Sequence, residues 1–189
     1  MNEIVREVKV LPTYYDGTKF RSRLEARWAI FFDYLRIPYR YEYEGFDLDG
    51  VWYVPDFYLP KQDYWIEVKP VSPSEKEQDK CERLAKATET STYCFWDIPR
   101  PWDGSDDGPA YAWRSEWYFN WDNCHNFIQC HNCGAIRIEY YEHSYWYCNH
   151  CDSEADNEAK QLKIAYEVAR RFRFDNFKIA ESGRIINEN

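Results

Sequence analysis

The spacing of apolar residues predicts a helix at residues 22–35. Four large apolar side chains recur at the three- and four-residue intervals that place them on one helical face: Leu24, Trp28, Phe31 and Leu35. Ser22, followed three residues later by Glu25, fits a capping box that satisfies free N–H groups at a helix start. Glu25 also lies beside the apolar face, so its carboxylate can point toward the protein interior.

Aromatic and aliphatic runs predict four strands, within residues 39–48, 51–59, 64–69 and 92–96. Asp49-Gly50 separates the first two runs and is a strong signal for a tight hairpin. Pro55 cannot donate a hydrogen bond to a neighbouring strand, so we expect the second run to be irregular or at an edge there.

A second helix is expected at residues 72–89, with Ser72 as its N-cap, Pro73 at the first helical position and Glu75 completing a capping box. The order helix, three strands, helix, strand requires a right-handed crossover, which makes the fourth strand parallel to the third. The expected fold class is therefore α/β (α+β), with a mixed four-stranded sheet flanked by helices.

The composition narrows the class of protein. Aromatic residues make up 20% of the 189 residues, which is enough to build a sizeable core. The net charge of −9 argues against a protein that coats nucleic acid through bulk charge, although local basic surfaces remain possible. The first twelve residues lack the apolar run of a signal peptide, and no stretch is apolar enough to span a membrane. We expect a cytoplasmic protein that does not bind membranes.

The residue composition changes after the fourth predicted strand, and this change predicts that the chain is divided into distinct regions. Residues 1–100 form the expected core, and residues 101–126, rich in Trp, Pro and Asp, are interpreted as a linker. Residues 127–152 contain most of the cysteines. Residues 153–189 are expected to form a C-terminal helix, roughly 154–173, and a tail.

Two Cys-x-x-Cys pairs, fourteen residues apart, indicate a metal site: Cys130, Cys133, Cys148 and Cys151. In a cytosolic chain this spacing favours metal over disulfides, and four thiolates suit tetrahedral Zn²⁺. The arrangement resembles a zinc ribbon. Because four protein ligands leave no position for substrate, we expect the Zn²⁺ to be structural.

Charged residues in the third strand suggest a second site. Side chains alternate between the faces of a strand, so Glu67 and Lys69 emerge on the same face, opposite Ile66 and Val68. A short link at residues 60–63 can bring Asp56 beside Glu67. Two adjacent carboxylates repel each other unless a cation lies between them, and hard oxygen ligands suit Mg²⁺.

The same residues resemble the PD-(D/E)XK nuclease superfamily, which has the restriction-endonuclease-like fold. Here the motif reads Pro55-Asp56, ten intervening residues, then Glu67-Val68-Lys69. The helical acid is Glu25, and the order of elements matches the family core. The resemblance covers residues 18–98 and is strongest to small phage and mobile-element members.

The resemblance implies metal-dependent hydrolysis of a phosphodiester, usually leaving a 5′-phosphate. Asp56, Glu67 and the Val68 carbonyl would hold Mg²⁺ or Mn²⁺, Lys69 would be the catalytic lysine and Glu25 an auxiliary ligand. The alternative from the residues alone is a surface ion pair between Glu67 and Lys69, with Glu25 serving only its capping box.

Two local clusters of arginines are candidate contacts for nucleic acid, with DNA as the expected partner: Arg21, Arg23 and Arg27 in the first helix region, and Arg170, Arg171 and Arg173 in the last. Each is also consistent with an ordinary solvated helix face. Cutting both strands of a duplex would need a homodimer or two successive nicks. The rival function is a non-catalytic adaptor that binds nucleic acid or protein through the zinc ribbon.

Overall fold

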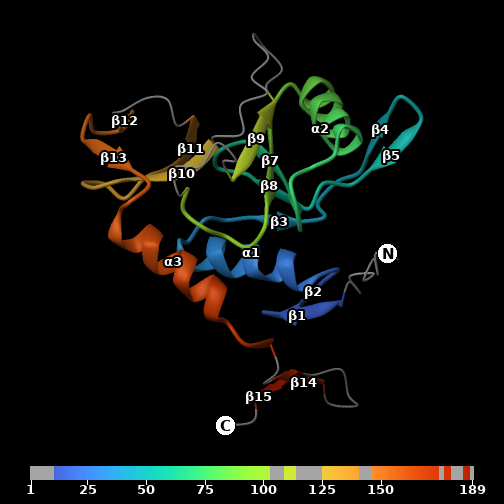
Figure 1. The fold of residues 1–189 in the computed structure, drawn as a ribbon, viewed down its shortest axis with the longest axis horizontal. Coiled ribbons are helices and arrows are strands. Elements are labelled where there is room, and N and C mark those ends of the chain that lie inside the picture. The colour runs from blue at the N-terminus through green and yellow to red at the C-terminus, as the bar shows by residue number, and fades with distance from the viewer. Residues whose placement is uncertain are drawn as a thin grey trace, which may run out of the picture.

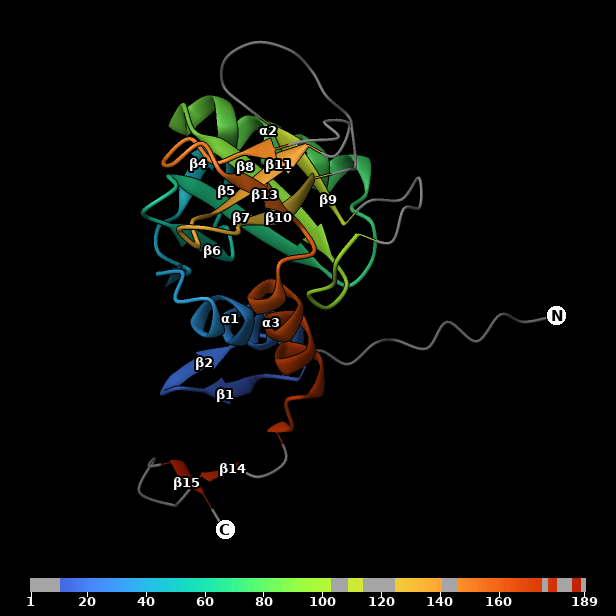
Figure 2. The same cartoon turned by 90° about the vertical axis from the view of Figure 1, so that its left-hand side faces the viewer.

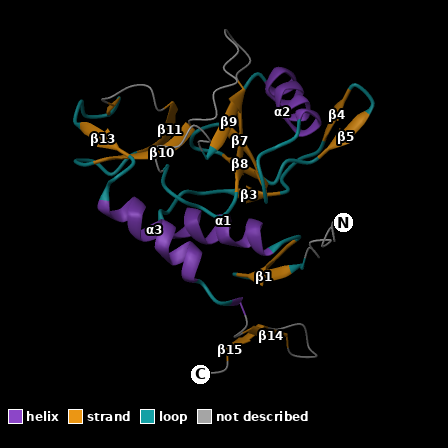
Figure 3. Cartoon of the chain, viewed as in Figure 1, coloured by secondary structure: helices purple, strands orange, loops and turns teal. Residues whose placement is uncertain are grey.

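The computed structural model describes residues 11–102, 109–113, 125–140 and 146–174, together with the backbone of residues 177–179 and 185–187. Its three helices are α1 (Arg23–Tyr34), α2 (Glu75–Thr88) and α3 (Lys160–Arg171) (Figure 3). The mixed α+β class is confirmed, because these helices accompany several sheets, one of them both parallel and antiparallel. Most of the expected linker, residues 103–108 and 114–124, lies outside the described residues.

The central sheet has five strands in the order β3-β6-β7-β8-β9. Their bounds are Arg40–Tyr41, Phe57–Leu59, Tyr64–Lys69, Ser91–Trp96 and Ala110–Trp113. β7 and β8 are parallel, as the crossover through α2 predicts, and the register places Glu67 opposite Cys94. The expected four-stranded sheet is wrong by one strand, because β9 comes from the stretch interpreted as a linker and pairs with β8 through alternately buried residues.

The two aromatic runs after α1 each divide into two strands. β4 (Phe46–Leu48) and β5 (Val51–Tyr53) form a separate hairpin, while β3 and β6 join the central sheet. The Asp49-Gly50 turn is confirmed: both residues have positive φ, 53° and 82°, as a tight hairpin turn requires. In Figure 1 the β4–β5 hairpin projects from the body beside α2.

The capping prediction for α2 is wrong by two residues. The N-cap is Ser74, whose N–H and hydroxyl donate to Glu77 Oε2 at 2.9 Å and 2.7 Å. Ser74 and Glu77 repeat the spacing of Ser72 and Glu75, so the local pattern fits both positions. Contacts from outside the helix favour the later start, since Glu77 also lies 3.7 Å from the ammonium group of Lys69.

The cysteine-rich segment forms a four-stranded sheet in the order β11-β10-β13-β12. The strands are β10 (His125–Cys130), β11 (Ile136–Tyr140), β12 (Trp146–Tyr147) and β13 (Glu154–Asp156). Because β13 pairs with both β10 and β12, α3 begins at Lys160 and not near 154 as expected. Two further hairpins are β1 (Thr13–Tyr15) with β2 (Thr18–Phe20), and β14 (Phe177–Ile179) with β15 (Ile185–Asn187).

One hydrophobic core joins α1, the central sheet, the cysteine-rich sheet and α3. Phe127 of β10 stacks on Phe95 of β8 with ring centroids 5.2 Å apart, and Phe31 of α1 stacks on Tyr166 of α3 at 4.8 Å. α1 and α3 lie side by side beneath the sheets, whereas α2 covers the other face (Figures 1 and 2). Ile66 and Val68 therefore face α1, and Trp65 joins Leu84 on the α2 face.

Candidate functional sites

The third strand and its neighbour bring two acids together inside the protein. β6 runs antiparallel to β7 with Phe57 opposite Ile66, which places Asp56 next to Glu67. The Asp56 N–H donates to Glu67 Oε2 at 3.3 Å, and the Val68 N–H donates to Asp56 Oδ2 at 2.8 Å. Asp56 and Glu67, hereafter the carboxylate pair, are only 3% and 4% exposed.

This burial makes negative charge at the carboxylate pair unfavourable. The pKa of Asp56 lies well above its ordinary value because the group is desolvated and because the charges of Glu67 and Glu25 repel its ionised form. The hydrogen bond from the Val68 N–H opposes this shift and does not cancel it. A site that concentrates carboxylates away from water in this way favours the arrival of a cation.

Lys69 already supplies one cation. Its Nζ lies 2.5 Å from Glu67 Oε1 and 3.7 Å from Glu77 Oε1. Burial lowers the pKa of Lys69, but the Glu67 carboxylate outweighs this effect, so the pKa lies above its ordinary value. Lys69 is therefore a charged donor here and cannot accept a proton at neutral pH.

Arg21 supplies the other cation, a role that the sequence did not reveal. Its guanidinium lies 2.6 Å from Asp56 Oδ1 and 2.8 Å from Glu42 Oε1, and 4.0 Å from Glu25 Oε2. Glu42 and Tyr41 were not predicted as site residues. Their sequence positions give no sign of a role in the site, because the start of α1 and the β3 region come together only in the folded chain.

Glu25 lies at the edge of the site with Arg21 between it and Asp56. Its carboxylate accepts hydrogen bonds from the Ser22 hydroxyl at 2.8 Å, the Arg21 N–H at 3.1 Å and the Tyr41 hydroxyl. The Ser22 cap of α1 is confirmed, since Ser22 Oγ accepts from the Glu25 N–H at 3.1 Å. The inward-pointing interpretation of Glu25 describes this side chain, whereas its carboxylate accepts from the Arg21 N–H and the Ser22 hydroxyl and not from the Ser22 N–H that a capping box would use.

The carboxylate pair opens into a pocket of about 820 Å³. Besides the acids and Lys69, the lining includes Val68, Trp52 and Lys80. Asp56 and Glu67 both line this pocket, and carboxylates of this kind could hold a hard divalent cation if it displaced Arg21 and Lys69, which now bind Asp56 Oδ1 and Glu67 Oε1. The three acids do not by themselves converge on one point: in the part of the chain that the structure describes, only the cysteines form a group of three or more ligands close enough for one ion.

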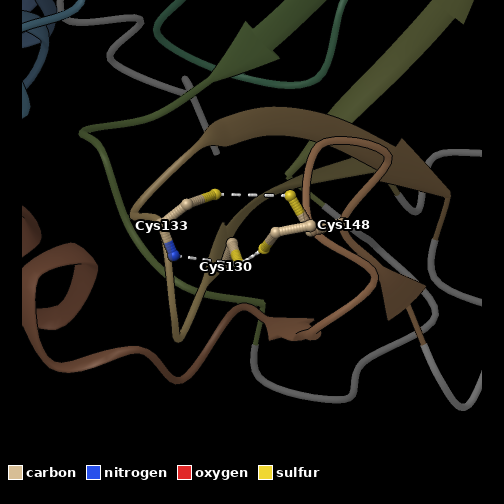
Figure 4. Close-up of side chains that lie close together, drawn as sticks. Cys130, Cys133 and Cys148 are labelled. Atoms are coloured by element: carbon tan, nitrogen blue, oxygen red, sulfur yellow. Dashed lines mark hydrogen bonds between the residues drawn. The ribbon is translucent and has the colours of Figure 1, made fainter.

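The four predicted cysteine ligands do converge; Figure 4 labels three of them, Cys130, Cys133 and Cys148. Cys130 lies 3.5 Å from Cys151 and Cys133 lies 3.5 Å from Cys148, sulfur to sulfur, and all four sulfurs lie within 4.8 Å of one another. Four sulfurs around Zn²⁺ at about 2.3 Å are separated from each other by about 3.8 Å. These residues, hereafter the cysteine cluster, can therefore bind a zinc ion.

Backbone N–H groups donate to two of the sulfurs in the cysteine cluster. The Cys133 N–H donates to Cys130 Sγ at 3.5 Å, and the His150 N–H donates to Cys148 Sγ at 3.4 Å. The hydroxyl and then the N–H of Ser153 lower the pKa of Cys151 to about 6. Gly134 turns the first knuckle at φ +72°, the left-handed conformation expected for it.

The packing of α1 against α3 brings the two arginine clusters together. The Arg27 guanidinium donates to the carbonyl oxygens of Ala169 and Arg170, the latter at 2.6 Å, so Arg27 closes the end of α3. Arg170 and Arg171 pair with Glu167 at 3.7 Å and 2.9 Å on the exposed side of α3. Arg27 therefore links the two clusters at the end of α3, whereas the Arg21 guanidinium is held at Asp56 and Glu42.

Comparison of the chain with protein-family models, with curated proteins and with solved structures gives no match. Among the described residues, no helix has both the length and the apolar character needed to cross a membrane.

Proposed function

We propose that the protein is a metal-dependent endonuclease that hydrolyses phosphodiester bonds, with DNA as the expected substrate. The observation that carries this proposal is the buried carboxylate pair with Lys69 bonded to it, facing a pocket of about 820 Å³. The order of elements around it, with β6 antiparallel and β8 parallel to β7, agrees with the restriction-endonuclease-like core that the motif resembles.

A bound Mg²⁺ or Mn²⁺ would lower the pKa of a water and offset charge on a phosphate oxygen. Asp56 and Glu67 would hold this ion, and the Val68 N–H keeps the Asp56 carboxylate oriented through its 2.8 Å hydrogen bond. Lys69, which is protonated, would donate to the attacking water or to the phosphate and stabilise negative charge as it develops. An ion held at Asp56 would take the place of the Arg21 guanidinium there, and Arg21 would then be able to bind the phosphate.

The cysteine cluster completes the proposal as a structural zinc ribbon. Its four ligands close the coordination sphere, so it takes no part in the hydrolysis. Since Phe127 and Ile138 from this sheet belong to the core shared with α1 and β8, the zinc site supports the fold that holds the carboxylate pair. Arg23, Arg170, Arg171 and Arg173 are the proposed contacts to the phosphate backbone.

One observation favours a second candidate, the non-catalytic adaptor. The Arg21 guanidinium bonds Asp56 at 2.6 Å, and an arginine in that position can neutralise the acids permanently. An adaptor would bind nucleic acid with the same affinity whether or not Mg²⁺ is present.

The test uses zinc-loaded protein with Mg²⁺ or Mn²⁺ and labelled single-stranded, duplex and branched DNA, together with RNA. Glu67→Gln is the site variant. Glu82→Gln is its control, because Glu82 pairs with Lys86 on α2 and does not line the pocket among the described residues. We expect metal-dependent cutting that Glu67→Gln abolishes and Glu82→Gln retains. Binding without cutting on every substrate would overturn the nuclease and favour the adaptor.

A further inference from the structure

The pocket at the carboxylate pair has an aromatic wall that the proposed hydrolysis does not use. Trp52 lies in its lining and is 70% exposed, although it sits in a strand. A large apolar ring left in water at a candidate active site calls for an explanation, because burying it elsewhere would stabilise the fold.

The exposure does not come from a loosely held hairpin. Residues on the inner face of β4–β5, Leu48 and Tyr53, are buried with Trp65 and Leu84, which anchors the hairpin to the central sheet and α2. Trp52 alternates with Tyr53 and so faces outward, paired across the hairpin with Asp47. Its ring position is therefore set by a fixed backbone.

Gly45 lies against the indole ring of Trp52. A Cβ atom added at residue 45 would lie 2.3 Å from Trp52 Cζ2, closer than any real contact, so the indole packs directly on the bare backbone. Gly45 thus packs against the indole while the side chain as a whole stays 70% exposed. This is the arrangement of a rigid stacking platform.

We propose that Trp52 stacks on an unpaired nucleobase next to the phosphodiester held at the carboxylate pair, so that the substrate is single-stranded or locally opened nucleic acid. The proposal rests on the proposed function, since the carboxylate pair places the phosphate. Bases in a duplex have their faces covered by their neighbours, so only an unpaired base can offer one to Trp52. Lys80 and Arg23 also line the pocket and carry the charge that the phosphates flanking such a base require.

Nucleic-acid binding measured without divalent metal tests this proposal independently of cleavage. Fluorescence anisotropy would compare a labelled single strand with the same sequence as a blunt duplex, using wild type, Trp52→Ala, Trp52→Phe and Gly45→Ala. Tyr147→Ala is the control, because Tyr147 is a 56% exposed aromatic residue on β12 of the cysteine-rich sheet. Circular dichroism and zinc content would verify that each variant folds.

We expect Trp52→Ala to weaken single-strand binding by about 5- to 100-fold, the usual effect of one lost base–aromatic stack. Trp52→Phe should lose less, Gly45→Ala should also lose affinity because its Cβ displaces the ring, and duplex binding and Tyr147→Ala should be unchanged. Wild-type affinity of Trp52→Ala, or an equal loss for duplex, would overturn the proposal. A wild type that never cuts but shows the selective loss would refute the nuclease and leave this inference standing.

Discussion

The cysteine cluster and the carboxylate pair assemble their ligands in different ways. Each knuckle brings two sulfurs together through a short turn, and backbone N–H groups already point at them. Asp56 lies just before β6 and Glu67 lies in β7, and protein cations, Arg21 and Lys69, compensate their charges. The difference suggests that the first site serves stability and the second serves chemistry, so mutations should separate the two.

The largest expected effect is on the cysteine cluster. Cys148→Ser removes one of four ligands, and structural Zn²⁺ contributes on the order of 10 kcal/mol of binding free energy to small metal-dependent modules. Zinc measured by mass spectrometry should fall from one per chain to near zero, and the melting temperature of the whole protein should drop because β10 shares its core. His131→Ala, which changes an exposed residue paired with Asp156, should keep its zinc. A full zinc content in Cys148→Ser would contradict the assignment of Cys148 as a zinc ligand.

A smaller effect, which leaves the zinc site intact, is expected at Lys69. Lys69→Met removes the charged donor beside Glu67 and should lower the single-turnover cleavage rate by about 10²- to 10³-fold. Zinc content should stay close to wild type, whereas the melting temperature should fall because buried Glu67 loses its ion-pair partner. Cleavage at the wild-type rate would show that Lys69 only forms an ion pair with Glu67.

The pH dependence of stability should reveal the repulsion at the carboxylate pair. Without magnesium, Asp56 has a raised pKa in the folded protein, so above the ordinary aspartate range the folded state retains a proton that the unfolded chain has lost. The Asp56 contribution to the free energy of unfolding therefore falls as pH rises through this window. Asp56→Asn removes this contribution. Urea unfolding would be measured between pH 4.5 and 8, a range above the pKa of about 3.9 of a free aspartate. The free energy of unfolding should fall more steeply with pH for wild type than for Asp56→Asn. If the free energy of unfolding of wild type and of Asp56→Asn changed equally with pH, a raised pKa of Asp56 would be contradicted.

The smallest effect is expected at the knuckle turn. Gly134→Ala places a Cβ at φ +72° and should lower stability by about 1 kcal/mol. Gly17→Ala is the matched control, since Gly17 has φ +77° in the β1–β2 turn, away from the cysteines. Thermal unfolding should shift for both variants, whereas only Gly134→Ala should speed zinc loss to a chelator. Equal rates of zinc loss would show that the turn does not support the cluster.

Features set by neighbouring residues could be predicted from the sequence. The Ser22 cap, the Asp49-Gly50 turn and the Cys-x-x-Cys pairs each depend on a few adjacent positions, and all three appear where expected. The parallel pairing of β7 and β8 also followed, because a crossover through a helix has one preferred hand.

Features set by distant contacts could not be predicted. β9 has only four residues, and its pairing partner β8 lies across a Pro- and Asp-rich stretch. The sequence predicts a nucleic-acid contact for Arg21 from its charge alone, whereas Asp56 and Glu42 reach its guanidinium only in the folded chain. The start of α2 was misplaced because Ser72 and Ser74 offer the same local spacing, and the choice depends on tertiary contacts.

The most direct test measures cleavage of single-stranded DNA by zinc-loaded wild type and Asp56→Asn, each with and without added Mg²⁺, in buffer freed of other divalent ions. We expect cutting only by wild type with Mg²⁺, while both proteins keep one zinc per chain. Cutting by Asp56→Asn, or by wild type with zinc alone, would contradict the claim that the carboxylate pair is the catalytic metal site.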